Sequence, residues 1–103
     1  MSEYALTPLA KADVVDIWRY IAADNEDAAD RVERAIYDAC ELVAQSPARG
    51  HTRSDLTPRP LRFWTLTRYP NYTIVYRPDT APLQVIAVIH GKRNLPRSLK
   101  QRP

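Results

Sequence analysis

Apolar residues recur along the first half of the chain at the spacing of an α-helix. Over residues 8–23, the i, i+3, i+4, i+7 pattern is formed by Val14, Ile17, Trp18 and Ile21, which places them on one buried face. A second helix is predicted to end near residue 46, with buried positions at Ala29, Val32, Ile36, Ala39 or Cys40, and Val43. Because only a few polar residues join the helices, they are expected to form an antiparallel hairpin.

Local signals predict where each helix begins. Thr7 can cap the free N–H groups of a first turn, and Pro8 suits the first helical position. The segment 24–27 offers a cap and acids for the positive end of the second helix. Three charged residues of the first helix lie outside its apolar stripe and are expected to face water: Asp13, Asp16 and Arg19.

The second half of the chain changes to a period of two, which is typical of strands. A brief strand is predicted over residues 3–7, a loop over 46–60, and further strands over 61–66, 72–77 and 83–91. The sequence therefore predicts one α+β domain spanning residues 1–103. It contains an N-terminal strand, an antiparallel two-helix hairpin and a three-stranded antiparallel meander, with the helices packed on one face of the sheet.

The last predicted strand is apolar on both of its faces. Val85, Ala87 and Ile89 alternate with Ile86 and Val88, so both faces need a cover. A two-helix hairpin covers only one face of a small sheet, which makes the other face a candidate docking surface. The basic segment 96–103 is expected to be frayed.

Charge divides the chain into two opposite halves. Residues 1–46 carry four cations against ten acids, whereas residues 47–103 carry eleven cations against two acids. One interpretation is that the halves attract each other within the fold, and the other is that the basic half serves an acidic partner or a nucleic acid. The sequence leaves both alternatives open.

Standard catalytic chemistry is missing from the sequence. With only two glycines there is no phosphate-binding loop, and His51 and His90 lack ligand-spaced neighbours, so neither a metal nor a cofactor is expected. Cys40 falls in the apolar stripe of the second helix and is assigned to the core. No apolar run is long enough for a membrane helix, and residues 1–8 lack signal-peptide features, so a cytoplasmic protein is expected.

Four segments in order carry a family resemblance: DIWRYIAADN, SPARGHTRSDL, LRFWTLTRYPNYTIVYRP and VIAVIHGKRN. Together they resemble the ParE branch of the ParE/RelE toxin superfamily over nearly the whole chain. The resemblance implies the toxin of a type II toxin–antitoxin module, of the kind that stabilises plasmids or sits on bacterial chromosomes. It also implies inhibition of DNA gyrase by protein binding and neutralisation by a ParD-like antitoxin, with no sequence-specific DNA binding by this chain alone.

The branch is assigned from the end of the chain. In RelE-like enzymes a phosphate-binding Arg corresponds to Arg93, and a catalytic Tyr about six positions later corresponds to Leu99, which cannot transfer a proton. This favours a gyrase inhibitor without enzymatic activity. One alternative is a ribosome-dependent mRNA endoribonuclease that uses Arg62, His90 and Arg93. Another is an inactive relic that only binds its antitoxin.

Candidate contact residues form two sets. The expected target-binding residues are Arg62, Trp64, His90, Lys92, Arg93 and Leu99. The expected antitoxin-binding residues are Arg68, Tyr72, Tyr76, Arg77, Ile86 and Val88.

Overall fold

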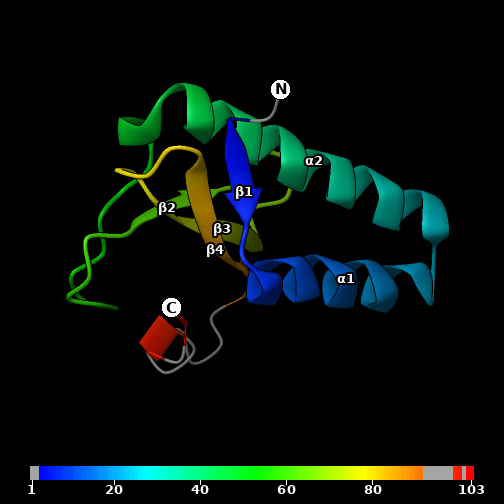
Figure 1. Cartoon of the computed structure of the whole chain (residues 1–103). Helices are drawn as coiled ribbons and strands as arrows, with labels where there is room; N and C mark the ends of the chain where they lie inside the picture. Colours follow the sequence, from blue (N-terminus) through cyan, green and yellow to red (C-terminus); the bar gives the residue numbers. More distant parts are fainter. Residues whose placement is uncertain (1–2, 92–98, 101) are drawn as a thin grey trace.

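A computed structural model of the chain describes residues 3–91, 99–100 and 102–103. Its elements follow in the order β1 (Tyr4–Leu6), α1 (Pro8–Ala22), α2 (Glu26–Gln45), the 3-10 turn η1 (Pro47–Arg49), β2 (Arg62–Thr65), β3 (Tyr72–Arg77) and β4 (Leu83–His90). Both helices lie on the same side of the sheet (Figure 1). The predicted α+β fold is therefore confirmed, with boundaries within a few residues of those expected.

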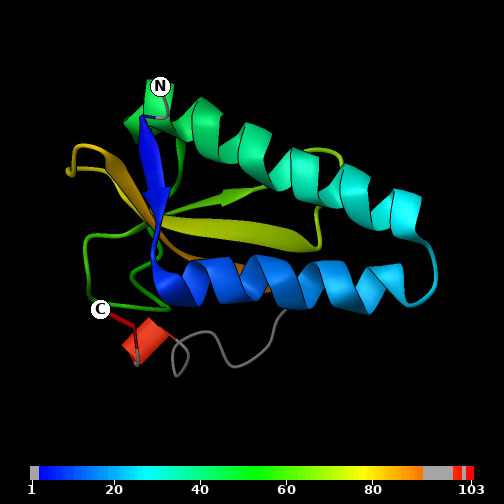
Figure 2. The same cartoon turned by 45° about the vertical axis from the view of Figure 1, so that its right-hand side comes forward.

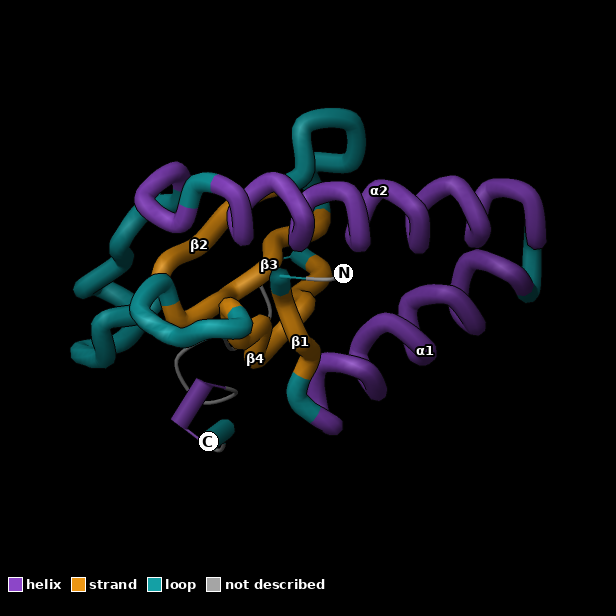
Figure 3. The backbone as a smooth tube through the Cα atoms, turned by 45° about the horizontal axis from the view of Figure 1, so that its top comes forward, coloured by secondary structure: helices purple, strands orange, loops and turns teal. Residues whose placement is uncertain are grey.

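The sheet has the strand order β1-β4-β3-β2. Strands β2, β3 and β4 form the predicted antiparallel meander, and β1 pairs with β4 in parallel, with Tyr4 opposite Leu83 and Leu6 opposite Val85. Figure 3 shows the strands gathered beside the helical hairpin. The sequence pattern predicted β1 but not its partner, because three residues are too few to show which edge they join.

Both helix starts form at the predicted residues. The Thr7 hydroxyl accepts a hydrogen bond from the Ala10 N–H at 3.2 Å, with Pro8 following in the first turn. The Asn25 side-chain oxygen accepts from the Ala28 N–H at 3.0 Å, and two acidic residues occupy the first turn of α2. These caps satisfy N–H groups that the helices cannot pair internally.

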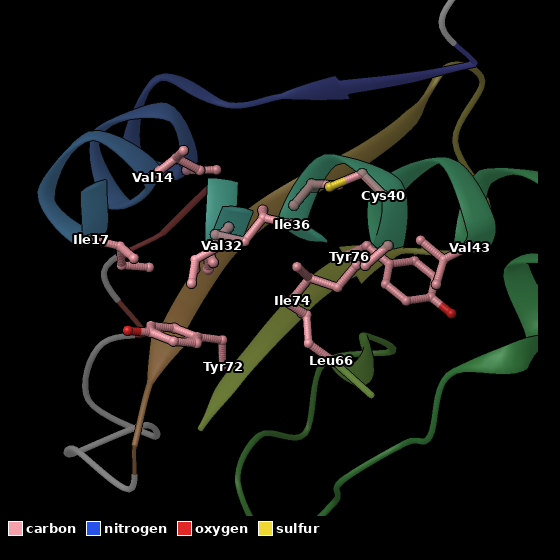
Figure 4. Close-up of a cluster of buried hydrophobic side chains, with 14 of the residues drawn as sticks. Val14, Ile17, Val32, Ile36, Cys40, Val43, Leu66, Tyr72, Ile74 and Tyr76 are labelled. Carbon is pink, nitrogen blue, oxygen red and sulfur yellow. The ribbon is translucent and has the colours of Figure 1, made fainter. Parts of the chain in front are cut away.

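The main core lies between the helices and the sheet. Figure 4 shows its side chains converging from α1, α2 and the strands, and they include Val14, Ile17, Val32, Ile36, Cys40, Val43, Leu66, Tyr72, Ile74 and Tyr76. The predicted stripe of α2 is buried throughout, including Cys40, whose burial raises the pKa of the thiol to about 12. Trp18 is only half-buried, and its indole N–H donates to the Asp30 carboxylate at 2.8 Å, which fastens α1 to α2.

Candidate partner-binding site

The second face of the sheet is covered by the chain itself. Its apolar side chains form a separate cluster with Leu56 of the 50–60 loop and with Leu99, which is only 1% exposed. Figure 2 shows this loop and the C-terminal turn, defined as Leu99, Lys100, Arg102 and Pro103, beside each other. The expectation of an open docking face is wrong, because loop and turn together supply the cover that the helices cannot.

Two arginines hold the C-terminal turn in place. The Arg59 guanidinium donates to the backbone carbonyls of Leu99, Arg102 and Pro103. Arg102 donates to the Ile86 carbonyl at 2.8 Å and forms an ion pair with Asp13 at 2.8 Å. The expectation of fraying is therefore wrong for these four residues.

Asp13 also departs from the expectation that it faces water. Its carboxylate accepts a hydrogen bond from the Val88 N–H at 2.9 Å in addition to its ion pair with Arg102. β1 pairs with β4 only as far as Val85, so the Val88 N–H lies beyond the end of β1. Asp13 thus satisfies a backbone donor that the sheet leaves unpaired.

Burial removes four of the six expected antitoxin-binding side chains from the surface. Tyr72, Tyr76 and Val88 belong to the helix-side core, and Ile86 belongs to the cluster on the second face. In this conformation Tyr76, Ile86 and Val88 serve to stabilise the fold, whereas Tyr72 keeps a small exposed edge at the α1 side of the sheet. Arg68 is exposed and Arg77 is half-buried.

The expected target-binding residues are spread over several places. Leu99 is buried in the second cluster, and Lys92 and Arg93 lie outside the described residues. Arg62 donates to the Gly50 carbonyl at 2.7 Å, so its guanidinium holds the loop. Trp64 is half-buried with the Arg49 guanidinium 5.9 Å from its ring centroid, and His90 is exposed at the end of β4.

The register separates two residues of the endoribonuclease alternative. Arg62 on β2 lies opposite Tyr76, whereas His90 on β4 lies opposite Tyr72, four positions along β3. That offset corresponds to roughly 13 Å along the strands, and two strand spacings add about 10 Å across the sheet. The backbones of Arg62 and His90 are therefore well separated on the sheet, and the Arg62 guanidinium is directed to the Gly50 carbonyl.

A groove between α2 and the β2–β3 connection brings other candidates together. It encloses about 330 Å³, and its lining residues are Ala35, Asp38, Ala39, Leu42, Trp64, Leu66, Thr67 and Arg68. A smaller depression of about 130 Å³ shares Ala35, Asp38 and Arg68 and adds Arg31, Arg34 and Tyr69. We call the two together the hairpin groove.

The hairpin groove combines an apolar floor with an end where three arginines outnumber one carboxylate, that of Asp38. Such a surface suits an amphipathic peptide that carries a large apolar side chain and nearby acids. The sequence placed Trp64 and Arg68 in different contact sets, and the structure places them in one groove. The sequence analysis missed Ala35 and Leu42, although their spacing of seven residues indicates a second apolar line on α2.

A second recess lies at the α1 side of the sheet. It encloses about 250 Å³ and is lined by Asp16, Ile17, Tyr20, Tyr72 and His90. We call it the Tyr20 recess. Sequence reasoning singled out Tyr72 and His90 but not Asp16 or Tyr20, because nothing in a single helix pattern shows which strand end will face it.

Neither a metal-ligand cluster nor a membrane-spanning helix is found in the described part of the chain. Residues 3–91, 99–100 and 102–103 contain no group of three or more His, Cys, Asp or Glu side chains arranged to hold a metal ion. Within the same part of the chain, neither helix combines the length and apolar character needed to cross a membrane.

Comparison with known proteins identifies the family. A family model described as the ParE toxin of a type II toxin–antitoxin system, parDE, matches residues 4–95. A solved structure described as the chromosomal ParDE TA system from P. aeruginosa matches with a TM-score of 0.71 at 20% identity, covering 86% of this chain and 95% of the other. At that identity the likeness shows the fold alone, and no curated protein matches the chain. Because the family model spans most of its length, the chain belongs to the ParE toxin family of type II toxin–antitoxin systems.

Proposed function

We propose that the chain inhibits DNA gyrase by binding it directly and is neutralised by a ParD-like antitoxin. The observation that carries this proposal is the match of residues 4–95 to the ParE toxin family. DNA gyrase acts in the cytoplasm, which is the location that we propose for this protein.

The sheet geometry supports inhibition by binding over RNA cleavage. Arg62 and His90, two of the three residues of the endoribonuclease alternative, lie on different strands. Their partners on β3 are four residues apart. Acid–base catalysis requires a group within hydrogen-bond reach of the reacting atoms. Arg62 also donates to a backbone carbonyl already, which favours a structural role.

The antitoxin is proposed to bind in the hairpin groove. Trp64 and Leu42 offer an apolar floor for a large side chain, and Arg31, Arg34 and Arg68 surround the adjoining depression. An antitoxin segment that places a leucine or aromatic residue on the floor and acids beside the arginines complements this groove in shape and charge.

The surface for gyrase is proposed to include the end of β4. His90 is exposed there, and Lys92 and Arg93 follow it in the sequence, outside the described residues. This assignment keeps the two partners on different parts of the protein.

The groove proposal is tested with charge reversal. Arg68→Glu is expected to weaken binding of the cognate antitoxin roughly tenfold in titration calorimetry, which corresponds to about 1.4 kcal/mol. Leu42→Asp should weaken it at least as much, because it places a charge on the apolar floor. Lys11→Glu makes the same charge change at an exposed position of α1 and serves as the control. Wild-type affinity in both groove variants would show that the antitoxin binds elsewhere.

Expression in cells separates the three functions. Induction without antitoxin should arrest growth and relax a reporter plasmid, and coexpressed antitoxin should restore both. Codon-specific mRNA cleavage with normal supercoiling would support the endoribonuclease instead. Normal growth would support the relic.

A further inference from the structure

The Tyr20 recess has the composition of a site for a positively charged group. We propose that it binds a cationic side chain, an arginine or a lysine, presented by a protein partner. The recess is a different surface from the hairpin groove. It shares His90 with the surface proposed for gyrase, but its test needs neither gyrase nor the antitoxin.

The recess is built from three elements that the fold brings together. Asp16, Ile17 and Tyr20 lie on adjacent turns of α1, while Tyr72 begins β3 and His90 ends β4 directly opposite it. Ile17 and Tyr72 are largely buried and form the floor. Figure 4 shows the Tyr72 ring beside Ile17 at the α1 end of the core.

Three aromatic rings lie next to one another in the recess. The centroids of His90 and Tyr72 are 4.8 Å apart with their planes inclined by 30°, and those of His90 and Tyr20 are 6.5 Å apart with an inclination of 38°. A cation is attracted to an aromatic face when it lies within about 6 Å of the centroid. His90 therefore packs on the buried Tyr72 ring, and the exposed ring of Tyr20 is the one that remains accessible to a charged group.

The exposure of Tyr20 points to a binding role. Tyr20 is 76% exposed, although it has one of the larger side chains in the helix. A ring so exposed gains little from burial on folding. A partner's side chain that packs against the Tyr20 ring would bury the apolar surface that is exposed in the free protein.

The Asp16 carboxylate determines that the recess favours a positively charged group. It is the one acid in the lining, and the ion pairs found in the described part of the chain, Arg53–Asp55 and Arg102–Asp13, do not involve it. Burial, and to a smaller extent Tyr20, raises the pKa of Tyr72, so its ring stays neutral at pH 7. A carboxylate beside the two tyrosine rings attracts a guanidinium or ammonium group and repels a phosphate.

The proposal is tested with small probes that need neither antitoxin nor gyrase. N-acetyl-arginine methylamide and the lysine equivalent are titrated into the labelled protein, and the ring resonances of Tyr20, Tyr72 and His90 are followed by NMR. Both cations are expected to shift these resonances saturably. The citrulline derivative, a neutral relative of the arginine probe, should bind more weakly by about fivefold, as expected for the loss of an exposed ion pair.

Substitutions locate the binding. Asp16→Asn and Tyr20→Ala should each weaken the arginine probe by up to about fivefold. Glu41→Gln removes a carboxylate from an exposed position on α2 and should leave the affinity unchanged. Amide spectra establish that each variant is folded.

Three results would overturn the proposal. The first is the absence of shifts with either cation, and the second is equal binding of arginine and citrulline. The third is a response of the same rings to inorganic phosphate and not to arginine, which would make the recess an anion site. None of these results affects the gyrase proposal, and failure of the gyrase assay leaves the recess untouched.

Discussion

Tyr76 shows how one buried polar atom organises distant parts of the chain. Its hydroxyl accepts from the Gly50 N–H at 2.9 Å and donates to the Pro47 carbonyl at 2.7 Å, joining β3 to the segment that follows α2. A Cβ atom at Gly50 would lie 2.5 Å from that hydroxyl, so this glycine permits the close approach. The alternating pattern placed Tyr76 in a strand, but it could not reveal partners 26 and 29 residues away.

Tyr76→Phe should therefore destabilise the protein without changing its fold. It removes the partner of a buried backbone N–H, which typically costs about 1–3 kcal/mol. Urea unfolding followed by circular dichroism measures the loss. Tyr20→Phe, at an exposed tyrosine, should be neutral, and an equal loss in both variants would refute the role given to the Tyr76 hydroxyl.

The buried thiol of Cys40 should make the stability of the protein depend on pH in the alkaline range. Burial raises the pKa of its thiol from the ordinary 9.0 to about 12, so the folded chain keeps a proton that the unfolded chain releases. The resulting stabilisation is complete below pH 9 and is lost as the pH rises from about 9 toward 12. The free energy of unfolding should fall by up to about 1.4 kcal/mol per pH unit in this range.

The Cys40→Ala variant isolates this effect. Its unfolding free energy should change less than that of the wild type between pH 8 and about pH 9.5, below the ordinary tyrosine pKa of about 10. Equal slopes in the two proteins would mean that Cys40 does not carry the pH dependence.

At the scale of elements, the periodicity of apolar residues was sufficient for most of the fold. It located both helices and the three strands of the meander, because each presents a regular face to the core. It did not give the parallel pairing of β1 or the cover of the second face. That cover depends on contacts between residues 40 or more positions apart, such as Arg59 with the Leu99 and Arg102 carbonyls.

The wrong assignment of buried residues to the antitoxin had the same origin. The two-sided character of β4 correctly indicated that both of its faces are covered, but the sequence could not show that one cover is the C-terminal turn. Tyr72, Tyr76, Ile86 and Val88 were consequently assigned to a partner. The sequence showed that these side chains are largely apolar, but it did not show that the chain itself buries them.

Leu99→Ala tests whether the C-terminal turn is part of the folded core. Leu99 is 1% exposed, and removing a buried leucine side chain typically costs about 2–5 kcal/mol. Lys100→Ala, at the exposed neighbour in the same turn, is the matched control. Chemical denaturation should separate the two variants clearly, and equal stability would show that the turn does not cover the sheet in solution.

Across the whole molecule, the division of charge remains available for recognition. Within the described residues, the one ion pair that joins the acidic half to the basic half is Arg102–Asp13, whose side chains are 14% and 19% exposed. Ion pairing therefore engages two of the eight cations of residues 47–103 that the structure describes, Arg53 and Arg102. Such a surplus favours association with acidic partners and makes that association sensitive to salt.

Supercoiling of relaxed plasmid by purified DNA gyrase tests the central proposal most directly. The account predicts that supercoiling falls as the toxin is added up to micromolar concentration, and that a stoichiometric amount of the cognate antitoxin restores it. Unchanged supercoiling at micromolar toxin, measured with protein that is folded and binds its antitoxin, would contradict the account.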